Sequence, residues 1–393
     1  MTTTQQTPGE TAAAAPQIDG SPKPYRVVVW GTGNLGRAAL RELMRRPEIE
    51  VVAVLGHNPS RHGTDAGESI LGGAKIGVPV TTDKDDIYTM RDVDCILHMA
   101  TVTPDMTDDV VRLLESGKNV ISSAGFHNPA YHGEEFVARL EKACTSGNSS
   151  LCGNGLHPNL MFERLTLAST ALTSRVEHIS FAEYADCSAI GPEGEGILRR
   201  VGLGATPEVL QAALAENPIE DSWLAQYYVE SLHFVLNKIY GISPAEMTTS
   251  IDVDWDLATA DMDTNVMKVH KGEVMAIRNT YKAHVDGVLR GTMDQYYYLG
   301  EQACPLDERV GQTTHIAIVQ GDPTSYQMRF DAGGSLRPSV EREDDSTAAA
   351  AYICVMPIIQ AVPKVTSSPA GIIMPEEFTY AASDLHSLAP ILN

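Results

Sequence analysis

The stretch GTGNLG, Gly31–Gly36, decides how the first half of this 393-residue chain folds. It follows a continuous apolar run, Tyr25–Trp30, and precedes the helical pattern Leu35–Arg46. A Gly-x-Gly-x-x-Gly loop between a strand and a helix is the fingerprint of a dinucleotide-binding fold. Its first glycine allows a tight turn, its second lets the backbone approach a pyrophosphate, and its third allows close helix packing. The N-terminus of the helix supplies amides and a positive dipole end to the phosphates.

The residues that follow the second strand, Ile49–Leu55, indicate which dinucleotide the protein binds. An NAD-specific site usually places Asp or Glu about 20 residues after the glycines, where it binds the ribose hydroxyls. Gly56 stands there instead, and Arg61 follows among His, Asn and Ser side chains that suit a 2′-phosphate. We therefore predict NADP as the cofactor, with NAD as the alternative if this segment is only a turn with a solvated arginine.

Buried-type strands alternate with helical patterns from Tyr25 to about Cys152. Cys95–Met99 and Asn119–Ser122 are two further apolar strands, and Glu134–Cys144 is a helix. Apolar strands that alternate with helices predict an α/β, Rossmann-type, doubly wound parallel sheet. We place this dinucleotide-binding domain at residues 24–154.

The pattern changes after Gly153. Trp223–Ile239 has apolar residues at helical spacing, and Asp286-Gly287 is a tight-turn signal between two strands. A second strand pair surrounds Gly321-Asp322-Pro323. We predict a second, α+β domain with a mostly antiparallel sheet at residues 155–345, and a C-terminal helix within 346–393 that packs back on the first domain. Residues 1–23 are predicted to be a disordered tail.

Composition narrows the class of protein. A formal net charge of −22 argues against a nucleic-acid partner, because such binding needs clustered Lys and Arg. The six cysteines form no Cys-x-x-Cys pair, so no metal site is expected and the thiols suit a reducing compartment. The apolar segment Ala348–Val362 contains Pro357 and is too short to span a bilayer. We predict a soluble cytoplasmic protein without a membrane partner.

Several segments give the chain a family resemblance. They are GTGNLG, His98-Met99-Ala100-Thr101, Gly117–Ser123, Gly155–Leu160, Gly202-Leu203-Gly204 and the final Ala-rich helix. With these the chain resembles the dihydrodipicolinate reductase-like superfamily, and most of all its branch of 2,4-diaminopentanoate dehydrogenase and NAD(P)-dependent amine dehydrogenases. In such folds the loops at the carboxyl edge of the sheet meet the nicotinamide, so the loops after the fourth and fifth strands are expected to line it. The resemblance suggests a homodimer or larger oligomer joined through the antiparallel sheet of the second domain.

The predicted cofactor-binding residues come from the glycine loop, the end of the second strand and these two later loops. They are Gly31, Thr32, Gly33, Asn34, Leu35, Gly36, His57, Asn58, Ser60, Arg61, Ala100, Thr101, Thr103, Ser122 and Ser123.

The loop after the fifth strand departs from the family pattern. The amine dehydrogenase branch resembles Ser-Thr-Cys-Glu-Glu there, with a glutamate thought to activate ammonia or the imine, whereas this chain has Ala124-Gly125-Phe126. Phe126 is expected to keep water from the hydride. The candidates for the missing acid or base are His127, His157, Glu163 and Tyr131, each of which could equally be a structural residue.

These observations predict an NAD(P)H-dependent oxidoreductase that transfers a hydride to or from a small organic C=N substrate, an imine or amine. The absent glutamate leaves two alternatives open. One is an NADPH-dependent carbonyl reductase acting on a ketone, and the other is a non-catalytic NADP-binding sensor or scaffold.

Overall fold

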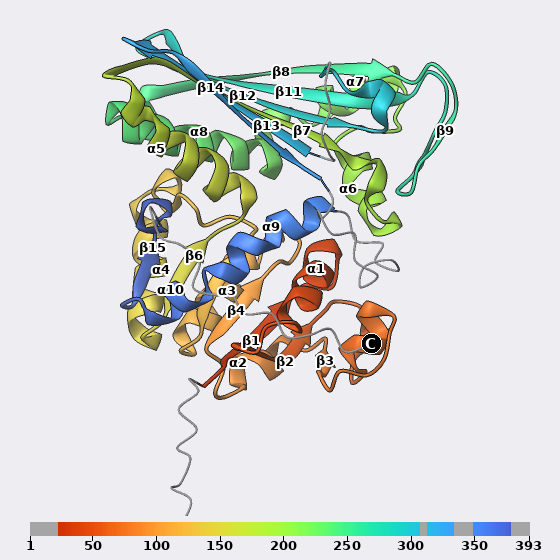
Figure 1. Cartoon of the computed structure of the whole chain (residues 1–393), viewed down its shortest axis with the longest axis vertical. Helices are drawn as coiled ribbons and strands as arrows, with labels where there is room; N and C mark the ends of the chain where they lie inside the picture. Colours follow the sequence, from red (N-terminus) through yellow and green to blue (C-terminus); the bar gives the residue numbers. More distant parts are fainter. Residues whose placement is uncertain (1–22, 307–312, 334–348, 379–393) are drawn as a thin grey trace, which may run out of the picture.

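The computed structural model describes residues 23–306, 313–333 and 349–378, which form two sheets with helices between and beside them (Figure 1). Residues 1–22 of the predicted tail lie outside the described residues, as do 334–348 and 379–393, which held part of the predicted C-terminal segment.

The first sheet is wholly parallel and has the strand order β15-β6-β5-β4-β1-β2-β3. Its order reverses between β1 and β4, which creates the crevice at the carboxyl ends of the strands where such folds bind ligands. The strands are β1 (Tyr25–Trp30), β2 (Ile49–Leu55), β3 (Val80–Thr81), β4 (Cys95–His98), β5 (Asn119–Ser122), β6 (Ser150–Gly153) and β15 (Gly371–Ile373). The predicted doubly wound parallel sheet is confirmed.

Helices cover both faces of this sheet. They are α1 (Asn34–Leu43), α2 (Lys84–Thr89), α3 (Met106–Glu115), α4 (Glu134–Gly147), α9 (Ala349–Gln360) and α10 (Val362–Ser367). One apolar cluster joins α1, α9 and α10 to the sheet, and a second joins α2, α3 and α4. Ala350–Ser367 is long and apolar enough to cross a membrane by length and composition. However, Val355, Ile358 and Ile359 are fully buried against the sheet, as in the core helix of a globular domain.

The second sheet has six strands in the order β14-β13-β7-β12-β11-β8. Its pairs are antiparallel except β12 with β7. The strands are β7 (Arg175–Asp186), β8 (Met247–Leu257), β11 (Val274–Val285), β12 (Val288–Tyr298), β13 (Thr313–Asp322) and β14 (Tyr326–Ala332). Both predicted hairpins are confirmed, and Asp286 and Gly287 at the first turn have the positive φ angles that such turns need.

A long helix, α8 (Trp223–Tyr240), lies against the second sheet on the side of the first (Figure 1). Its apolar residues pack on β7, β11, β12 and β13, beside the kinked segment η4 (Leu156–Thr166). Smaller elements border this domain: α5 (Leu167–Ser169), α6 (Glu195–Arg200), α7 (Pro207–Glu216) and the short ribbon β9 (Met262–Asp263) with β10 (Lys268–Val269). α8 therefore lies between the second sheet and the loops that follow the parallel strands.

Candidate dinucleotide cleft and the adjoining polar layer

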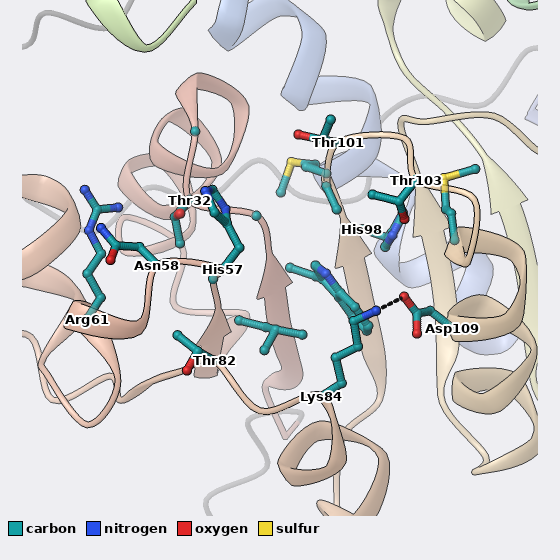
Figure 2. A pocket seen from close by; sticks show the side chains of 18 of the residues that line it. Thr32, His57, Asn58, Arg61, Thr82, Lys84, His98, Thr101, Thr103 and Asp109 are labelled. Atoms are coloured by element: carbon teal, nitrogen blue, oxygen red, sulfur yellow. Dashed lines mark hydrogen bonds and ion pairs between the residues drawn. The ribbon is translucent and has the colours of Figure 1, made fainter. Parts of the chain in front are cut away.

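A cleft of about 910 Å³ opens at the carboxyl ends of β1, β2 and β4. Most of the predicted cofactor-binding residues line it (Figure 2). These are Gly31, Thr32, Gly33, Asn34, His57, Asn58, Arg61, Ala100, Thr101 and Thr103. In Figure 2, Arg61 and Asn58 lie at one end of the cleft, and His98 and Thr103 lie at the other. The structure thus brings together three segments that are far apart in the sequence.

The glycine loop has the shape that a pyrophosphate needs. A Cβ at Gly31 would lie 2.5 Å from the carbonyl oxygen of Met99, and one at Gly36 would lie 2.0 Å from the carbonyl oxygen of Gly31, so both positions require glycine. A Cβ at Gly33 would meet nothing within 4 Å. No side chain of the described residues caps the N-terminus of α1. The loop therefore leaves open space and backbone donors where a dinucleotide phosphate would bind.

Three residues of the glycine loop and of the segment after β2 were predicted to bind the cofactor but lie outside the cleft lining. Leu35 packs into the apolar cluster under α1. Gly36 serves the contact between helix and turn, as its predicted packing role requires. Ser60 turns back and donates a hydrogen bond from Oγ to Oδ1 of Asn58 at 2.9 Å, which fixes the short turn η1 (Pro59–Arg61).

The distribution of charged residues at the end of β2 is the one expected from the sequence. No acidic residue borders the cleft beside His57 and Asn58 in the described part of the chain. The guanidinium of Arg61 has no hydrogen bond or ion pair there either. Lys84 also borders the cleft, but its Nζ lies 2.6 Å from Oδ2 of Asp109 and 2.8 Å from Oδ2 of Asp105 (Figure 2). Arg37 of α1 borders the cleft as well, and Arg61 is the cation that lies beside His57 and Asn58, where it is available for an anion.

The far end of the cleft is bordered by a neutral histidine. Nδ1 of His98 lies 3.0 Å from Oγ of Ser122, and its ring meets Trp30 edge-on. Burial lowers the pKa of His98 to about 4, so the ring carries no charge at neutral pH. Ser122 is fully buried behind this histidine. Ser123 turns its carbonyl towards α8, where the hydroxyl of Tyr227 donates to it at 2.9 Å. Neither serine lines the cleft.

The loop after β5 follows a different course from the one we expected. Phe126 has a φ of +67° and points into the apolar cluster under α3 and α4, where its ring stacks on Phe136 at 6.3 Å. It belongs to the core of the first domain, so the expectation that it shields the hydride is wrong. A Cβ at Gly153 would come within 2.3 Å of the backbone nitrogen of His127, so β6 holds this loop closely.

Two of the predicted catalytic candidates lie in this loop and face α8. The side chain of His127 is 2% exposed, and its Nδ1 lies 3.7 Å from Oε1 of Glu230. Tyr131 packs its ring on His233 and lies beyond the cleft. Glu230 also accepts a hydrogen bond from the backbone nitrogen of Asn128 at 3.0 Å. α8 thus holds the loop through one buried carboxylate.

The other two candidates lie in the kinked segment η4. The side chain of His157 is 1% exposed and sits 4.6 Å from the ring of Phe181. Burial lowers its pKa far below the usual range, so the ring is neutral. Glu163 accepts hydrogen bonds from the backbone nitrogen of Asn159 at 2.8 Å and from the hydroxyl of Ser231. Oε2 of Glu163 also lies 3.9 Å from Nδ1 of His157, so Glu163 is a structural carboxylate beside the middle of α8.

Sequence reasoning missed one acid in this layer, Glu183 of β7. It follows Ile179 and Phe181 at strand spacing, so it points to the same side as these two buried residues, towards α8. A carboxylate on the apolar face of an alternating strand was the signal in the sequence. Tyr228 of α8 donates a hydrogen bond to its Oε2 at 2.8 Å.

The fold and the cleft define a two-domain protein with a Rossmann-type dinucleotide site. Comparison with known proteins narrows this class. Residues 25–139 match the family described as dihydrodipicolinate reductase, N-terminus. The chain is 32% identical over 184 residues to an amine dehydrogenase of Streptomyces virginiae, a match that covers 45% of this chain and 50% of that protein. The chain therefore matches about half the length of this relative.

A second relative matches a longer part of the chain, with lower sequence identity. The chain is 24% identical over 305 residues to the 2,4-diaminopentanoate dehydrogenase of Acetoanaerobium sticklandii, covering 76% of this chain and 81% of that protein. Among solved structures, the amine dehydrogenase from Mycobacterium smegmatis has the same fold, with a TM-score of 0.68 and 16% identity over 90% of this chain and 95% of that chain. The predicted resemblance to the dihydrodipicolinate reductase-like superfamily and its amine dehydrogenase branch is confirmed.

Proposed function

We propose that this chain is an NAD(P)H-dependent oxidoreductase that transfers a hydride to or from the C=N bond of a small imine or amine. The observation that carries the proposal is the course of the cleft. It runs from Arg61 and Asn58 past the glycine loop to His98 and Thr103, next to the loop that α8 holds. The enzyme class itself agrees with the relatives, two of which are named as dehydrogenases of amines.

The residues present fit a dinucleotide, and we propose NADP as the preferred one. The glycine loop and the N-terminus of α1 would hold its pyrophosphate, Arg61 with Asn58 its 2′-phosphate, and Thr101 with Thr103 the nicotinamide end. When bound, the cofactor supplies or accepts the hydride. A neighbouring solved structure, GenD2 from gentamicin A biosynthesis, is in complex with NAD and shares the fold with a TM-score of 0.50.

The protein's own residues orient the reacting groups. His98 stays neutral, so it can form a hydrogen bond to Ser122 without placing a charge beside the nicotinamide end. Glu230 and Tyr227 fix the loop after β5 against α8. This arrangement holds the loop rigid and limits the access of water from the side of the second sheet. We further propose a cytoplasmic location and no macromolecular partner other than a second copy of the chain.

Oxidation of NADPH by the purified protein tests the proposal. The protein is mixed with a panel of small ketones, each with and without ammonia, and absorbance reports the cofactor. We expect oxidation that depends on ammonia. Equal rates without ammonia would indicate a carbonyl reductase instead, and cofactor binding without turnover across the panel would indicate a sensor.

A further inference from the structure

A row of polar side chains crosses the second sheet beneath α8. Glu183 of β7 pairs in register with Gln295 of β12 on one side and with His315 of β13 on the other. Gln295 pairs in turn with Asn279 of β11. Neighbours in register lie side by side on one face of a sheet, so four adjacent strands present one polar row. Apolar residues of the same strands lie further along that face and pack on α8.

Three members of the row are buried and Glu183 is half-buried, and the hydrogen-bonding groups of the row are only partly satisfied. Asn279, Gln295 and His315 are at most 2% exposed. Nδ2 of Asn279 donates to Oε1 of Gln295 at 3.0 Å, yet Oδ1 of Asn279 and Nε2 of Gln295 have no partner among the described residues. Both ring nitrogens of His315 also lack a hydrogen-bond partner there. Those of His157, which stands next to the row against Phe181, make no hydrogen bond either, although its Nδ1 lies 3.9 Å from Oε2 of Glu163. Buried polar atoms without partners are rare in folded proteins, and they indicate a position where a ligand or water binds.

Glu183 differs from the other two acids around α8. Glu163 and Glu230 are held by hydrogen bonds from Asn159, Ser231, Asn128 and His132. Glu183 accepts one hydrogen bond, from Tyr228 to Oε2, and its Oε1 has no partner in the described part of the chain. A carboxylate oxygen is thus left for a donor that the protein does not supply.

The surroundings of this carboxylate suit a cation with an apolar body. The hydroxyls of Tyr228 and Tyr297 lie 3.1 Å apart next to Glu183. The ring of Tyr228 stacks on Tyr281 at 5.1 Å, so aromatic faces line the layer. Aromatic rings attract ammonium groups, and a carboxylate in such an apolar setting binds a positive charge more strongly than one in water.

The row lies next to the loop at the end of the cleft. Tyr227 precedes Tyr228 on α8, and its hydroxyl donates to the carbonyl of Ser123 at 2.9 Å. Its ring also meets His127 edge-on at 5.3 Å. Tyr227 of α8 therefore contacts the loop after β5, and the next residue, Tyr228, contacts Glu183 of the second sheet.

We propose that Glu183 is the acid that this chain uses in place of the missing loop glutamate, and that it binds the substrate nitrogen as an ammonium or iminium cation. The proposal rests on the proposed function, because it assigns the nitrogen of that amine or imine. In the direction of reduction, the Glu183 carboxyl gives its proton to the imine nitrogen. A new N–H bond forms, the O–H bond breaks, and a carboxylate remains beside an iminium carbon that accepts hydride. In the reverse direction, the amine carbon gives up its hydride to the oxidised cofactor, and the carboxylate then takes the proton from the nitrogen of the resulting iminium. The neighbouring orphan groups of Gln295, His315 and His157 would bind polar substituents of the substrate.

Binding of simple cations tests this assignment without turnover. Calorimetry measures the affinity of the NADP-loaded protein for alkylammonium ions from methylammonium to cyclohexylammonium, and for the alcohols of the same carbon skeletons. Glu183→Gln keeps the shape of the side chain and its bond to Tyr228. We expect it to weaken ammonium binding about tenfold or more, since a charge-assisted hydrogen bond is lost, and to leave alcohol binding unchanged.

Glu177→Gln is the matched control. It makes the same substitution on the same strand, but its side chain is 42% exposed and pairs with arginines on the surface. It should bind ammonium ions within about twofold of the wild type. Equal ammonium affinity in Glu183→Gln, or no ammonium binding by the wild type, would overturn the assignment.

Measurements of turnover distinguish a failure of the Glu183 assignment from a failure of the proposed function. The proposed function fails when no ketone supports ammonia-dependent oxidation of NADPH, whatever the binding experiment gives. Where the wild type does turn over, Glu183→Gln should lose at least about a hundredfold in rate while its affinity for NADPH is kept. Full turnover in that variant would reject Glu183 as the proton donor and leave the oxidoreductase activity standing.

Discussion

We propose that the choice of cofactor depends on Arg61. It borders the cleft, and the described part of the chain offers no carboxylate to its guanidinium. Lys84, the next cation along the cleft, is already bound by two aspartates. A 2′-phosphate beside Asn58 would therefore meet the guanidinium of Arg61 and no neighbouring acid among the described residues.

Arg61→Ala should weaken NADPH binding by about tenfold or more, because one charge-assisted phosphate contact contributes roughly 1.5–3 kcal/mol. NADH lacks the phosphate, so its affinity should stay nearly unchanged. Fluorescence titration with each cofactor measures the two effects. Arg91→Ala removes the same charge from an exposed position outside the cleft and should change neither affinity. Equal losses for NADPH and NADH would contradict the preference for NADP.

Glu183 should make the stability of the folded protein depend on pH. Burial raises its pKa from 4.5 to about 7, although the hydrogen bond from Tyr228 opposes the shift. The folded protein therefore holds this proton more tightly than the unfolded chain does. Its contribution to stability is fully present below pH 4.5 and is lost as the pH rises to about 7, where the buried charge costs on the order of 3 kcal/mol.

Glu183→Gln should therefore raise the melting temperature at about pH 8 and change it little at about pH 5, because glutamine stays neutral. Other groups that face Glu183 do not titrate between these values. Burial raises the pKa of Tyr228 and Tyr297, raises that of Cys354 to about 12 and lowers that of His315 to about 4. Thermal unfolding at the two pH values measures the effect. The same shift at both would show that the carboxylate is not a buried charge.

The elements differ in how well the sequence predicted them. α8 was predicted to within a residue because its apolar positions recur at helical spacing. β7 was not predicted, because it alternates polar and half-buried residues and carries Glu183 on its apolar face. The contacts of α8 could not be predicted at all. Tyr227 meets Ser123 and Glu230 meets His127, which local patterns cannot reveal, since these pairs are distant in the sequence.

For the glycine loop, in contrast to the contacts of α8, the sequence indicated a structural role for each glycine. Gly36→Ala should prevent folding or lower stability strongly, because its Cβ would overlap the carbonyl oxygen of Gly31. Gly33→Ala should fold normally, because a Cβ there meets nothing and the φ of this residue is −80°. It should still lose NADPH affinity, as the methyl group occupies the approach of the pyrophosphate.

Circular dichroism melting and cofactor titration together measure these two variants. Gly196→Ala is a suitable control, since its Cβ also meets nothing within 4 Å and the residue lies on α6, outside the cleft. Gly33→Ala with unaltered NADPH affinity would mean that the phosphates do not pass this turn.

At the scale of the whole molecule, the second sheet offers a surface for a second copy. Ile316 of β13 pairs in register with Ala182 of β7, and Ile318 lies further along the same face. All three are half-buried and alternate with the residues that face α8. We propose that this strip contributes to the homodimer expected from the sequence, because partly exposed apolar residues gather at subunit interfaces.

Light scattering should give a mass near twice the 42.4 kDa of one chain. Ile316→Lys places a charge in the strip and should shift the protein towards the monomer, whereas Gln211→Lys, at an exposed position on α7, should not. A wild type that is monomeric at micromolar concentration would refute the proposed assembly.

The strand β15 bears on how this protein is made. β6 ends at Gly153 and β15, its neighbour in the parallel sheet, begins at Gly371, so the ribosome synthesises the whole second sheet between them. Until then the nascent first domain has an unpaired strand edge at β6 and lacks the apolar cover of α9 and α10. An open edge of this kind is a site where other chains can pair, so aggregation is a hazard for this domain until β15 has been made. The dinucleotide domain is therefore one unit in space, although its strands come from two separated segments of the sequence.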